Sequence, residues 1–260
     1  MELNLKNKKI LITGASQGIG AGLAEDFARE GCRLHLVARS AHKLESLATK
    51  IREDYGTEVT IQPLDLTAPG AIAAVVAAAD DIDVLVNNAG TIPSGSLWDV
   101  DEAAWRAGWD LKVFGYINLV RAYYPLMKAR GGGVIINNIG NSGEVFDPLY
   151  VAGTTGNAAL MAFTKAMGGD SLKDGIRVVG VNPGPVATER IYNMLKKRAA
   201  SNLGDADRYT ELEKTYPLGR PAHVSEVSQV IVFLASEHGG YTSGTIITVD
   251  GGITSRRSII

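Results

Sequence analysis

The chain has 260 residues, which is enough for one large α/β domain with a substantial buried core. Its formal net charge of −2 argues against a nucleic-acid partner, because such partners are held by many cationic contacts to phosphates. The single cysteine, Cys32, excludes an intrachain disulfide and a cysteine metal cluster, and we expect it to be a buried hydrophobe and no metal to be bound. The first residues do not form a signal peptide and no apolar run is long enough to span a membrane. We therefore expect a cytoplasmic protein without a membrane partner.

The stretch from Lys8 to Arg29 has the order strand, glycine loop, helix. Residues 10–12 form a short apolar run typical of a buried strand, and residues 21–29 repeat apolar side chains at a helical period. Glycines between them let the backbone turn tightly and approach a pyrophosphate, while the helix N-terminus offers unpaired N–H groups and a positive dipole end. The glycine spacing is G-x-x-x-G-x-G, and a plain turn is the alternative. The predicted phosphate-binding residues are Gly14, Ser16, Gln17, Gly18, Ile19 and Gly20.

The rest of the chain alternates expected strands with expected helices. Strands are expected at 33–38, 59–63, 82–86, 133–137, 176–181 and 245–249. Helices are expected at 41–53, 69–79, 101–129, between 150 and 173, in two pieces between 188 and 213, and at 224–236. This alternation predicts a parallel sheet covered by helices on both faces. Because no linker or repeat divides the sequence, we expect residues 1–260 to form one domain.

Five short motifs follow one another along the chain, each at the end of an expected strand. They are Thr13–Gly20, Asp65–Leu66, Asn87–Gly90, Asn182–Thr188 and Asp250–Gly252. In these motifs the sequence resembles the short-chain dehydrogenase/reductase family over nearly its whole length. The resemblance implies an α/β fold with a single Rossmann-type doubly wound domain and a seven-stranded parallel sheet. It also implies an NAD or NADP cofactor, hydride transfer between nicotinamide and a small-molecule carbonyl or alcohol substrate, and a homotetramer or dimer.

The same resemblance implies cofactor contacts after the third, fourth and sixth strands. Asp65 is implied to hydrogen-bond the adenine, the alternatives being a solvated loop aspartate or a helix cap. Backbone groups near Val186 and the Thr188 hydroxyl are implied to meet the nicotinamide amide and the phosphates, with a plain proline turn as the alternative. The full set of implied contacts is Asp65, Leu66, Asn88, Ala89, Gly90, Pro183, Gly184, Val186 and Thr188.

The end of the second expected strand bears on the choice of cofactor. Enzymes that use NAD tend to place an acid here for the ribose 2′-OH, whereas NADP enzymes supply a cation. Ala38 stands where the acid would be, and Arg39 can pair bidentately with a 2′-phosphate. Ser40 or Lys43 could add a donor. The turn therefore predicts NADP(H) rather than NAD(H), the alternative being an exposed surface arginine.

The family's catalytic residues are an asparagine, a serine and a Tyr-x-x-x-Lys pair, and none of them stands at its expected position here. The lysine position holds Asn157 and the tyrosine position holds Gly153. The serine position falls on Gly140 or Asn141, and the asparagine position falls on Lys112.

Suitable side chains lie nearby but displaced. Lys112 and Asn157 belong to helices that are neighbours in the family fold, so we predict that the amine and the amide have exchanged places. The Lys112 ammonium should then lie close to Asn157, reach the nicotinamide ribose and have a pKa depressed by burial. Ser142 is one or two residues from the serine position, and Tyr150 lies one helical turn before Gly153. These four side chains are the candidate catalytic residues; an ordinary helix lysine and a loop aromatic are the alternative.

Three functions remain open on the sequence. The first is an NADP(H)-dependent oxidoreductase with a rearranged active site. The second is a catalytically weak or inactive NADP(H)-binding protein that acts as a sensor or structural partner. The third is a different reaction with Lys112 as a base or Schiff-base former. Residues 189–215 are expected to cover the substrate pocket, and they show no clear anion-binding signature from which a substrate can be predicted.

Overall fold

Seven strands form one sheet in the order β3-β2-β1-β4-β5-β6-β7 in the computed structural model, which describes residues 1–256. All neighbouring strands are parallel, so the predicted seven-stranded parallel sheet is confirmed. Residues 257–260, which the expected single domain includes, lie outside the described residues. The strands are β1 (Lys9–Thr13), β2 (Arg33–Ala38), β3 (Val59–Pro63), β4 (Val84–Asn87), β5 (Gly133–Asn138), β6 (Ile176–Pro183) and β7 (Ile246–Val249).

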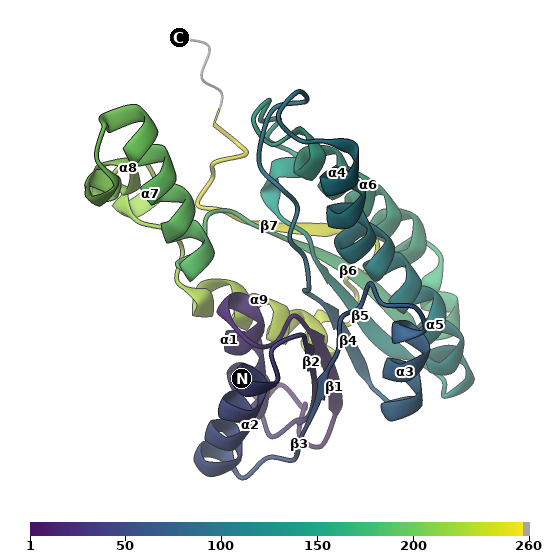
Figure 1. Cartoon of the computed structure of the whole chain (residues 1–260). Coiled ribbons are helices and arrows are strands. Elements are labelled where there is room, and N and C mark those ends of the chain that lie inside the picture. The colour runs from purple at the N-terminus through teal and green to yellow at the C-terminus, as the bar shows by residue number, and fades with distance from the viewer. Residues whose placement is uncertain (257–260) are drawn as a thin grey trace.

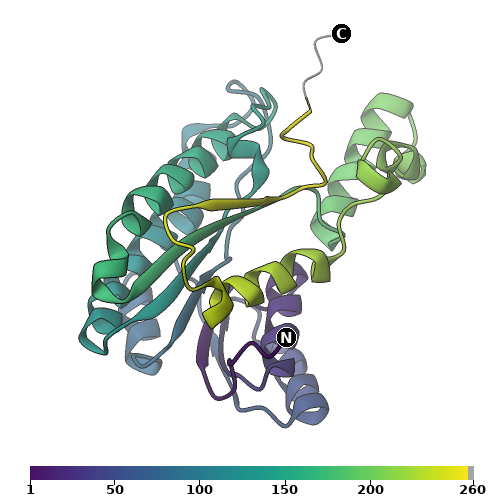
Figure 2. The ribbon, with the colours of Figure 1, turned by 180° about the vertical axis from the view of Figure 1, so that it is seen from behind.

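Helices cover both faces of this sheet (Figures 1 and 2). One face carries α1 (Gly18–Arg29), α2 (Ala41–Tyr55) and α9 (Val224–Ala235), which share a buried apolar cluster with the strands. The other face carries α3 (Ala71–Ala78), α5 (Gly115–Ala129) and α6 (Val151–Gly168), which pack in a second cluster. Apolar strand residues are therefore covered from both sides, which explains why the strands read as continuous apolar runs.

The long helix expected over 101–129 is interrupted by a single π-helical turn. Asp101 caps α4 (Glu102–Trp109), its carboxylate accepting from the Ala104 N–H at 2.7 Å. The π-turn spans Asp110–Phe114, and α5 begins directly after it. Such turns insert one residue into the helical hydrogen-bond pattern and are frequent at functional sites. Lys112 lies in this turn, so an irregular segment of backbone aims its side chain.

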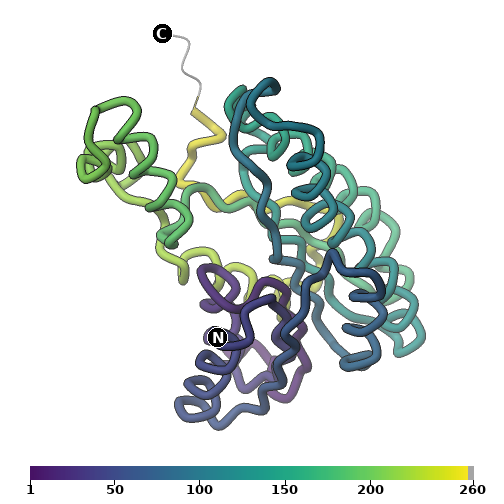
Figure 3. Tube along the Cα trace, viewed as in Figure 1, coloured from purple at the N-terminus to yellow at the C-terminus, as the bar shows by residue number. Residues whose placement is uncertain are grey.

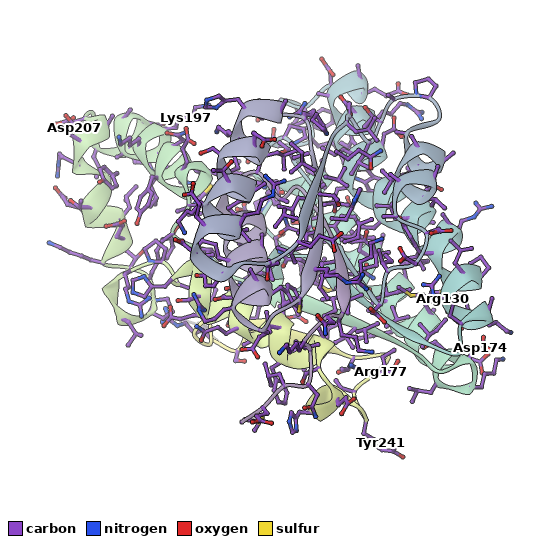
Figure 4. The ribbon with its side chains drawn as sticks, turned by 90° about the horizontal axis from the view of Figure 1, so that it is seen from below. Arg130, Asp174, Arg177, Lys197, Asp207 and Tyr241 are labelled. Carbon is purple, nitrogen blue, oxygen red and sulfur yellow. The ribbon has the colours of Figure 1, made fainter. Side chains whose placement is uncertain are left out.

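Two further helices lie beyond the carboxyl ends of the strands. They fall within residues 189–215, which are expected to cover the substrate pocket. The trace in Figure 3 leaves the sheet after β6, runs through these helices and returns to the sheet at α9. Figure 4 shows Lys197 and Asp207 on this outer layer, on the opposite side of the molecule from Arg130. The helices are α7 (Glu189–Leu203) and α8 (Tyr209–Glu213). Short 3₁₀ turns lie at Asn141–Gly143, Ser171–Asp174, Ala206–Arg208, Pro217–Gly219 and Glu237–Gly239.

Cys32 is fully buried, and its thiol donates a hydrogen bond to the Leu5 carbonyl at 3.3 Å. Burial raises the pKa of this thiol to about 12, so the reactive thiolate is suppressed. The expected role as a small buried hydrophobe is confirmed. Within residues 1–256, no helix is both long and apolar enough to cross a bilayer.

Candidate active site

The glycine loop after β1 can turn this tightly only because glycines carry no Cβ atom. Gly14 and Gly18 have φ values of +65° and +58°, in the left-handed region that favours glycine. A Cβ at Gly20 would lie 2.2 Å from the Gly14 carbonyl oxygen. The Gln17 side chain does not cap α1, so no side chain occupies the first-turn N–H groups. The predicted order of strand, glycine loop and helix is confirmed, and the loop has the form of a phosphate cradle.

Asn88 joins the ends of β1 and β4. Its Nδ2 donates to the carbonyls of Thr13 at 3.0 Å and Gly14 at 3.3 Å. The Thr13 hydroxyl in turn accepts from the N–H groups of Asn88 and Ala89, each at 3.0 Å. The two strands are neighbours at the point where the strand order reverses, which is where open parallel sheets bind ligands.

The loop after β6 packs onto the glycine loop from the other side. The Thr188 hydroxyl donates to the Val186 carbonyl at 3.2 Å, and its methyl group would lie 3.2 Å from a Cβ at Gly18. At Gly184, a Cβ would lie 2.7 Å from the Cβ of Asp250. With the contacts of Asn88, four of the five motifs therefore meet at one edge of the sheet.

The side chains at the end of β2 have local partners except for Arg39. Ser40 caps α2 by accepting from the Lys43 N–H at 3.4 Å. The Lys43 ammonium donates to the Gln17 side-chain oxygen at 2.7 Å and so ties α2 to the glycine loop. Arg39 is exposed and makes no ion pair among the described residues. Among the described residues of this turn, the Arg39 guanidinium is thus the cation that remains available to a ligand.

Asp65 does not cap a helix. Its carboxylate accepts from the N–H and the hydroxyl of Thr67 at 2.9 and 2.7 Å, and these bonds, with a smaller contribution from the Arg39 charge, lower its pKa. The following helix has Gly70 as its N-cap. The helix-cap alternative for Asp65 is therefore wrong.

Lys112 is buried against Gly90. A Cβ at Gly90 would lie 2.8 Å from Cδ of the lysine, so its aliphatic stem rests on the glycine backbone. Its Nζ donates to the Ile139 carbonyl at 2.5 Å. Burial, together with the nearby Arg190 charge, lowers the pKa of Lys112 to about 7. The predicted depression of this pKa is confirmed in direction and cause.

Asn157 binds the same short segment as Lys112. Its Nδ2 donates to the Ser142 hydroxyl oxygen at 2.6 Å, and a Cβ at Gly140 would lie 3.3 Å from that nitrogen. The structure shows no direct hydrogen bond between Lys112 and Asn157, which differs from the simple exchange expected above. Each side chain instead binds a group of residues 139–142.

Two buried amide oxygens near this segment have no hydrogen-bond partner in the described part of the chain. They are Oδ1 of Asn138 and Oδ1 of Asn157. A buried acceptor without a partner is costly, and such groups are commonly satisfied by water or ligand. Lys112 has donors beyond the one that Ile139 accepts. The segment therefore offers both donors and acceptors to a polar ligand.

The Tyr150 ring occupies the space that a side chain at position 153 would fill. A Cβ built on Gly153 would lie 2.0 Å from Cζ and 2.1 Å from Cε1 of this ring. Tyr150 immediately precedes α6, and the preceding loop is held by a hydrogen bond of 2.7 Å from the Gly95 N–H to the Leu149 carbonyl. A phenol from outside the helix thus lies over the helix position where the family places its tyrosine.

Arg190 is a site residue that the sequence analysis missed. Its Nη2 donates to the Tyr150 hydroxyl at 3.3 Å, and its charge is close enough to affect Lys112. It lies in the first turn of α7, two residues after Thr188. That position directly after a binding motif is the signal that could have found it.

Comparison with known proteins supports the family resemblance. The family model described as Enoyl-(Acyl carrier protein) reductase matches residues 14–254. Oxidoreductase UcpA of Escherichia coli O157:H7 is 36% identical over 256 residues, covering 96% of this chain and 95% of that protein. The crystal structure of L-sorbose reductase from Gluconobacter frateurii, in complex with NADPH and L-sorbose, superposes with a TM-score of 0.92. It is 33% identical in sequence, and the match covers 99% of this chain and 100% of that one.

A further solved structure shows that such neighbours differ in cofactor. A 7α-hydroxysteroid dehydrogenase in complex with NADH and 7-oxo glycochenodeoxycholic acid superposes with a TM-score of 0.84. It is 25% identical, and the match covers 96% of each chain.

Replacing Lys112 with methionine should change how stability depends on pH. The pKa of Lys112 is about 7 in the folded protein, against an ordinary value of 10.5, so the unfolded chain binds more protons between these values. The free energy of unfolding of the wild type should therefore rise with pH across this range, by at most about 1.4 kcal/mol per pH unit from this group. Lys112→Met lacks this contribution. Denaturant unfolding at about pH 7, 8 and 9 measures the difference.

The exposed Lys197 provides the matched control. Lys197→Met should leave the pH profile of the wild type unchanged. Profiles of wild type and Lys112→Met that run parallel would contradict a buried ammonium with a depressed pKa.

Proposed function

Because the chain belongs to the short-chain dehydrogenase/reductase family, we propose that it is an NADP(H)-dependent oxidoreductase with rearranged catalytic residues. It interconverts a small carbonyl compound and the corresponding alcohol. The observation that carries the proposal is the position of the Tyr150 ring, which fills the space of the missing side chain at Gly153. The family tyrosine is absent from its sequence position, yet a phenol lies over the same turn of α6.

The residues at the carboxyl edge of the sheet fit a nicotinamide dinucleotide. The glycine loop has no Cβ to hinder a pyrophosphate, and the N–H groups at the start of α1 are not capped by a side chain. The unpartnered Oδ1 atoms of Asn138 and Asn157, with the spare donors of Lys112, suit the hydroxyls of a ribose. The adenine half is assigned to Asp65 and Leu66, and the nicotinamide half to Asn88, Ala89, Gly90, Pro183, Gly184, Val186 and Thr188.

The chemistry divides between the cofactor and the side chains. When bound, NADPH supplies the hydride that the carbonyl carbon receives. The Tyr150 hydroxyl donates its proton to the carbonyl oxygen, so the substrate gains one hydride and one proton. The Ser142 hydroxyl, held by Asn157 at 2.6 Å, orients that oxygen. Lys112 is the proposed source of the proton that restores the phenol, because a pKa of about 7 leaves both forms of the amine populated at neutral pH.

A second candidate function is NADP(H) binding without turnover. It is favoured by one observation: within residues 1–256, Lys112 makes no hydrogen bond to Tyr150, so the pairing found in the family's Tyr-x-x-x-Lys motif is not reproduced. Tight NADPH binding with no turnover across a broad panel of carbonyls and alcohols would support this candidate.

Arg39 should set the preference for the phosphorylated cofactor. Its guanidinium is exposed and no acid stands at Ala38, so it can pair with a 2′-phosphate. Arg39→Ala should weaken NADPH binding about tenfold or more and leave NADH binding almost unchanged. Calorimetric titration of both cofactors into both proteins tests this. Equal affinity of the wild type for NADPH and NADH would remove the argument.

Gly153→Ala should abolish most turnover and leave the binding of NADPH intact. In an ordinary helix this change stabilises by about 1 kcal/mol. Here the new methyl group would overlap the Tyr150 ring, so the ring must move away from the site. We expect kcat for carbonyl reduction to fall about 100-fold or more, the usual loss of a general acid. NADPH oxidation across a carbonyl panel measures kcat, and calorimetry measures cofactor affinity.

Two further variants sharpen this test. Tyr150→Phe keeps the ring and removes the hydroxyl, so it should lose as much turnover as Gly153→Ala. Adding Gly153→Ala to Tyr150→Phe should lower kcat no further, since both changes act on one phenol. Lys112→Met should also lose turnover while keeping the adenine end of the cofactor site. Wild-type turnover in Tyr150→Phe would show that this phenol is not the proton donor.

We also propose a homo-oligomer, a tetramer or a dimer. A hollow of about 470 Å³ lies on the outer side of α4, lined by Leu97, Val100, Trp105, Trp109 and Phe114 among others. Exposed apolar surface of this kind marks an interaction site. Light scattering at micromolar concentration should give a multiple of the 27.5 kDa chain mass. A mass of one chain would contradict the proposal.

A further inference from the structure

We infer that Arg190 binds a carboxylate group of the substrate, so that the substrate is a short oxo acid or the corresponding hydroxy acid. The acid group lies one or two carbons from the carbon that exchanges the hydride. This inference rests on the proposed function, and it names the class of substrate that the site accepts.

Arg190 has donors to spare. A guanidinium carries five N–H donors in a planar fork that matches the two oxygens of a carboxylate. The structure gives Arg190 one hydrogen bond, from Nη2 to the Tyr150 hydroxyl, and no ion pair within residues 1–256. Its sequence neighbour Glu189 does not pair with it. The side chain is exposed on the side of α7 that reaches Tyr150, so a ligand can approach it.

The carboxylates around Tyr150 are engaged elsewhere. Asp147 pairs with Arg198 at 3.6 Å, and Glu144 accepts from the Thr248 hydroxyl at 3.0 Å. Asp250 accepts from Asn141 at 3.2 Å and from backbone N–H groups near the end of the described chain. Within residues 1–256, therefore, no carboxylate pairs with the Arg190 guanidinium.

The positive charges of Arg190 and Lys112 therefore lie close enough to affect each other. Besides burial, which is the larger cause, the Arg190 charge lowers the pKa of Lys112, and among residues 1–256 no acid opposes it. Uncompensated positive charge beside a reacting centre favours an anionic substrate, both in binding and in approach. A neutral carbonyl compound would leave this charge unmatched.

The distances limit where the acid group can be. A carbonyl oxygen that receives the Tyr150 proton lies roughly 2.7 Å from the phenol oxygen. The same phenol oxygen is 3.3 Å from Nη2 of Arg190. A carboxylate paired with that guanidinium therefore lies only a few bonds from the carbonyl oxygen. This separation accommodates a 2-oxo acid or a 3-oxo acid, the class that we infer.

Paired probes test the inference through activity. Pyruvate and acetoacetate carry the acid, and their methyl esters are neutral and nearly equal in shape. We expect the wild type to reduce at least one acid with a kcat/KM about tenfold or more above that of its ester. Arg190→Gln should lower the kcat/KM of the acid by much more than that of the ester, mainly through KM, and so lose that preference. Arg190→Lys should restore part of it, because it keeps the charge and loses the fork.

A binding experiment makes the test independent of turnover. Oxamate resembles a 2-oxo acid but is reduced poorly, and oxamide is its neutral counterpart. In the presence of NADPH, calorimetry should detect oxamate binding to the wild type, at least about tenfold weaker binding to Arg190→Gln, and no comparable change for oxamide. Lys197→Gln is the matched control and should bind oxamate like the wild type. It removes another exposed cation of α7 (Figure 4).

The outcomes separate this inference from the function on which it rests. Equal losses for acid and ester in Arg190→Gln would mean that Arg190 positions Tyr150, and would overturn the inference while leaving the oxidoreductase in place. Weaker NADPH binding with an unchanged acid preference would assign Arg190 to the cofactor and overturn it as well. A wild type that turns over nothing would reject the proposed function, and the oxamate titration would still decide whether Arg190 binds a carboxylate.

Discussion

The site depends on two places where the backbone carries no Cβ. At Gly90 the missing atom leaves room for the stem of Lys112, and at Gly153 it leaves room for the ring of Tyr150. Protein interiors are packed to nearly crystalline density, so a volume left by one side chain is filled by another. The loss of the family tyrosine and the presence of a tyrosine ring over the same helical turn are therefore two parts of one packing arrangement.

The fold could be predicted closely because its signals are local. The strands β2 and β3 have the bounds expected from their apolar runs, and every expected helix is present within a few residues of its predicted bounds. The π-turn at Asp110–Phe114 was not predicted. An apolar period describes a helix as regular, and a single inserted residue changes the direction of Lys112 without changing that period. The aim of this side chain is thus set by packing that the pattern does not encode.

The candidate site, too, could be predicted only in part from the sequence. The residues predicted to bind the cofactor follow strand ends, and a parallel sheet brings its strand ends together at one edge. The contact between Arg190 and Tyr150 joins residues 40 positions apart through α7, and no sequence spacing predicts where that helix packs. The sequence predicts that Lys112 and Asn157 lie close together, but each hydrogen-bonds a group of residues 139–142 and not the other. The predicted exchange of the two side chains thus takes the form of two separate hydrogen bonds, to Ile139 and to Ser142.

Tyr150 lies just before α6, although its ring covers one side of that helix. This position decides which contacts hold the ring. A residue within α6 would be held by the helical hydrogen bonds on both sides of it. Tyr150 is held instead by its loop and by Arg190 of α7, which donates a hydrogen bond to its hydroxyl. The loop itself is held by the hydrogen bond from the Gly95 N–H to the Leu149 carbonyl. Local opening of that loop requires no melting of the sheet, and loops open at a lower free energy than packed strands do. The proton donation proposed for Tyr150 and the global stability of the chain are therefore separable, and we expect substitutions in the loop to alter the first while the second stays constant.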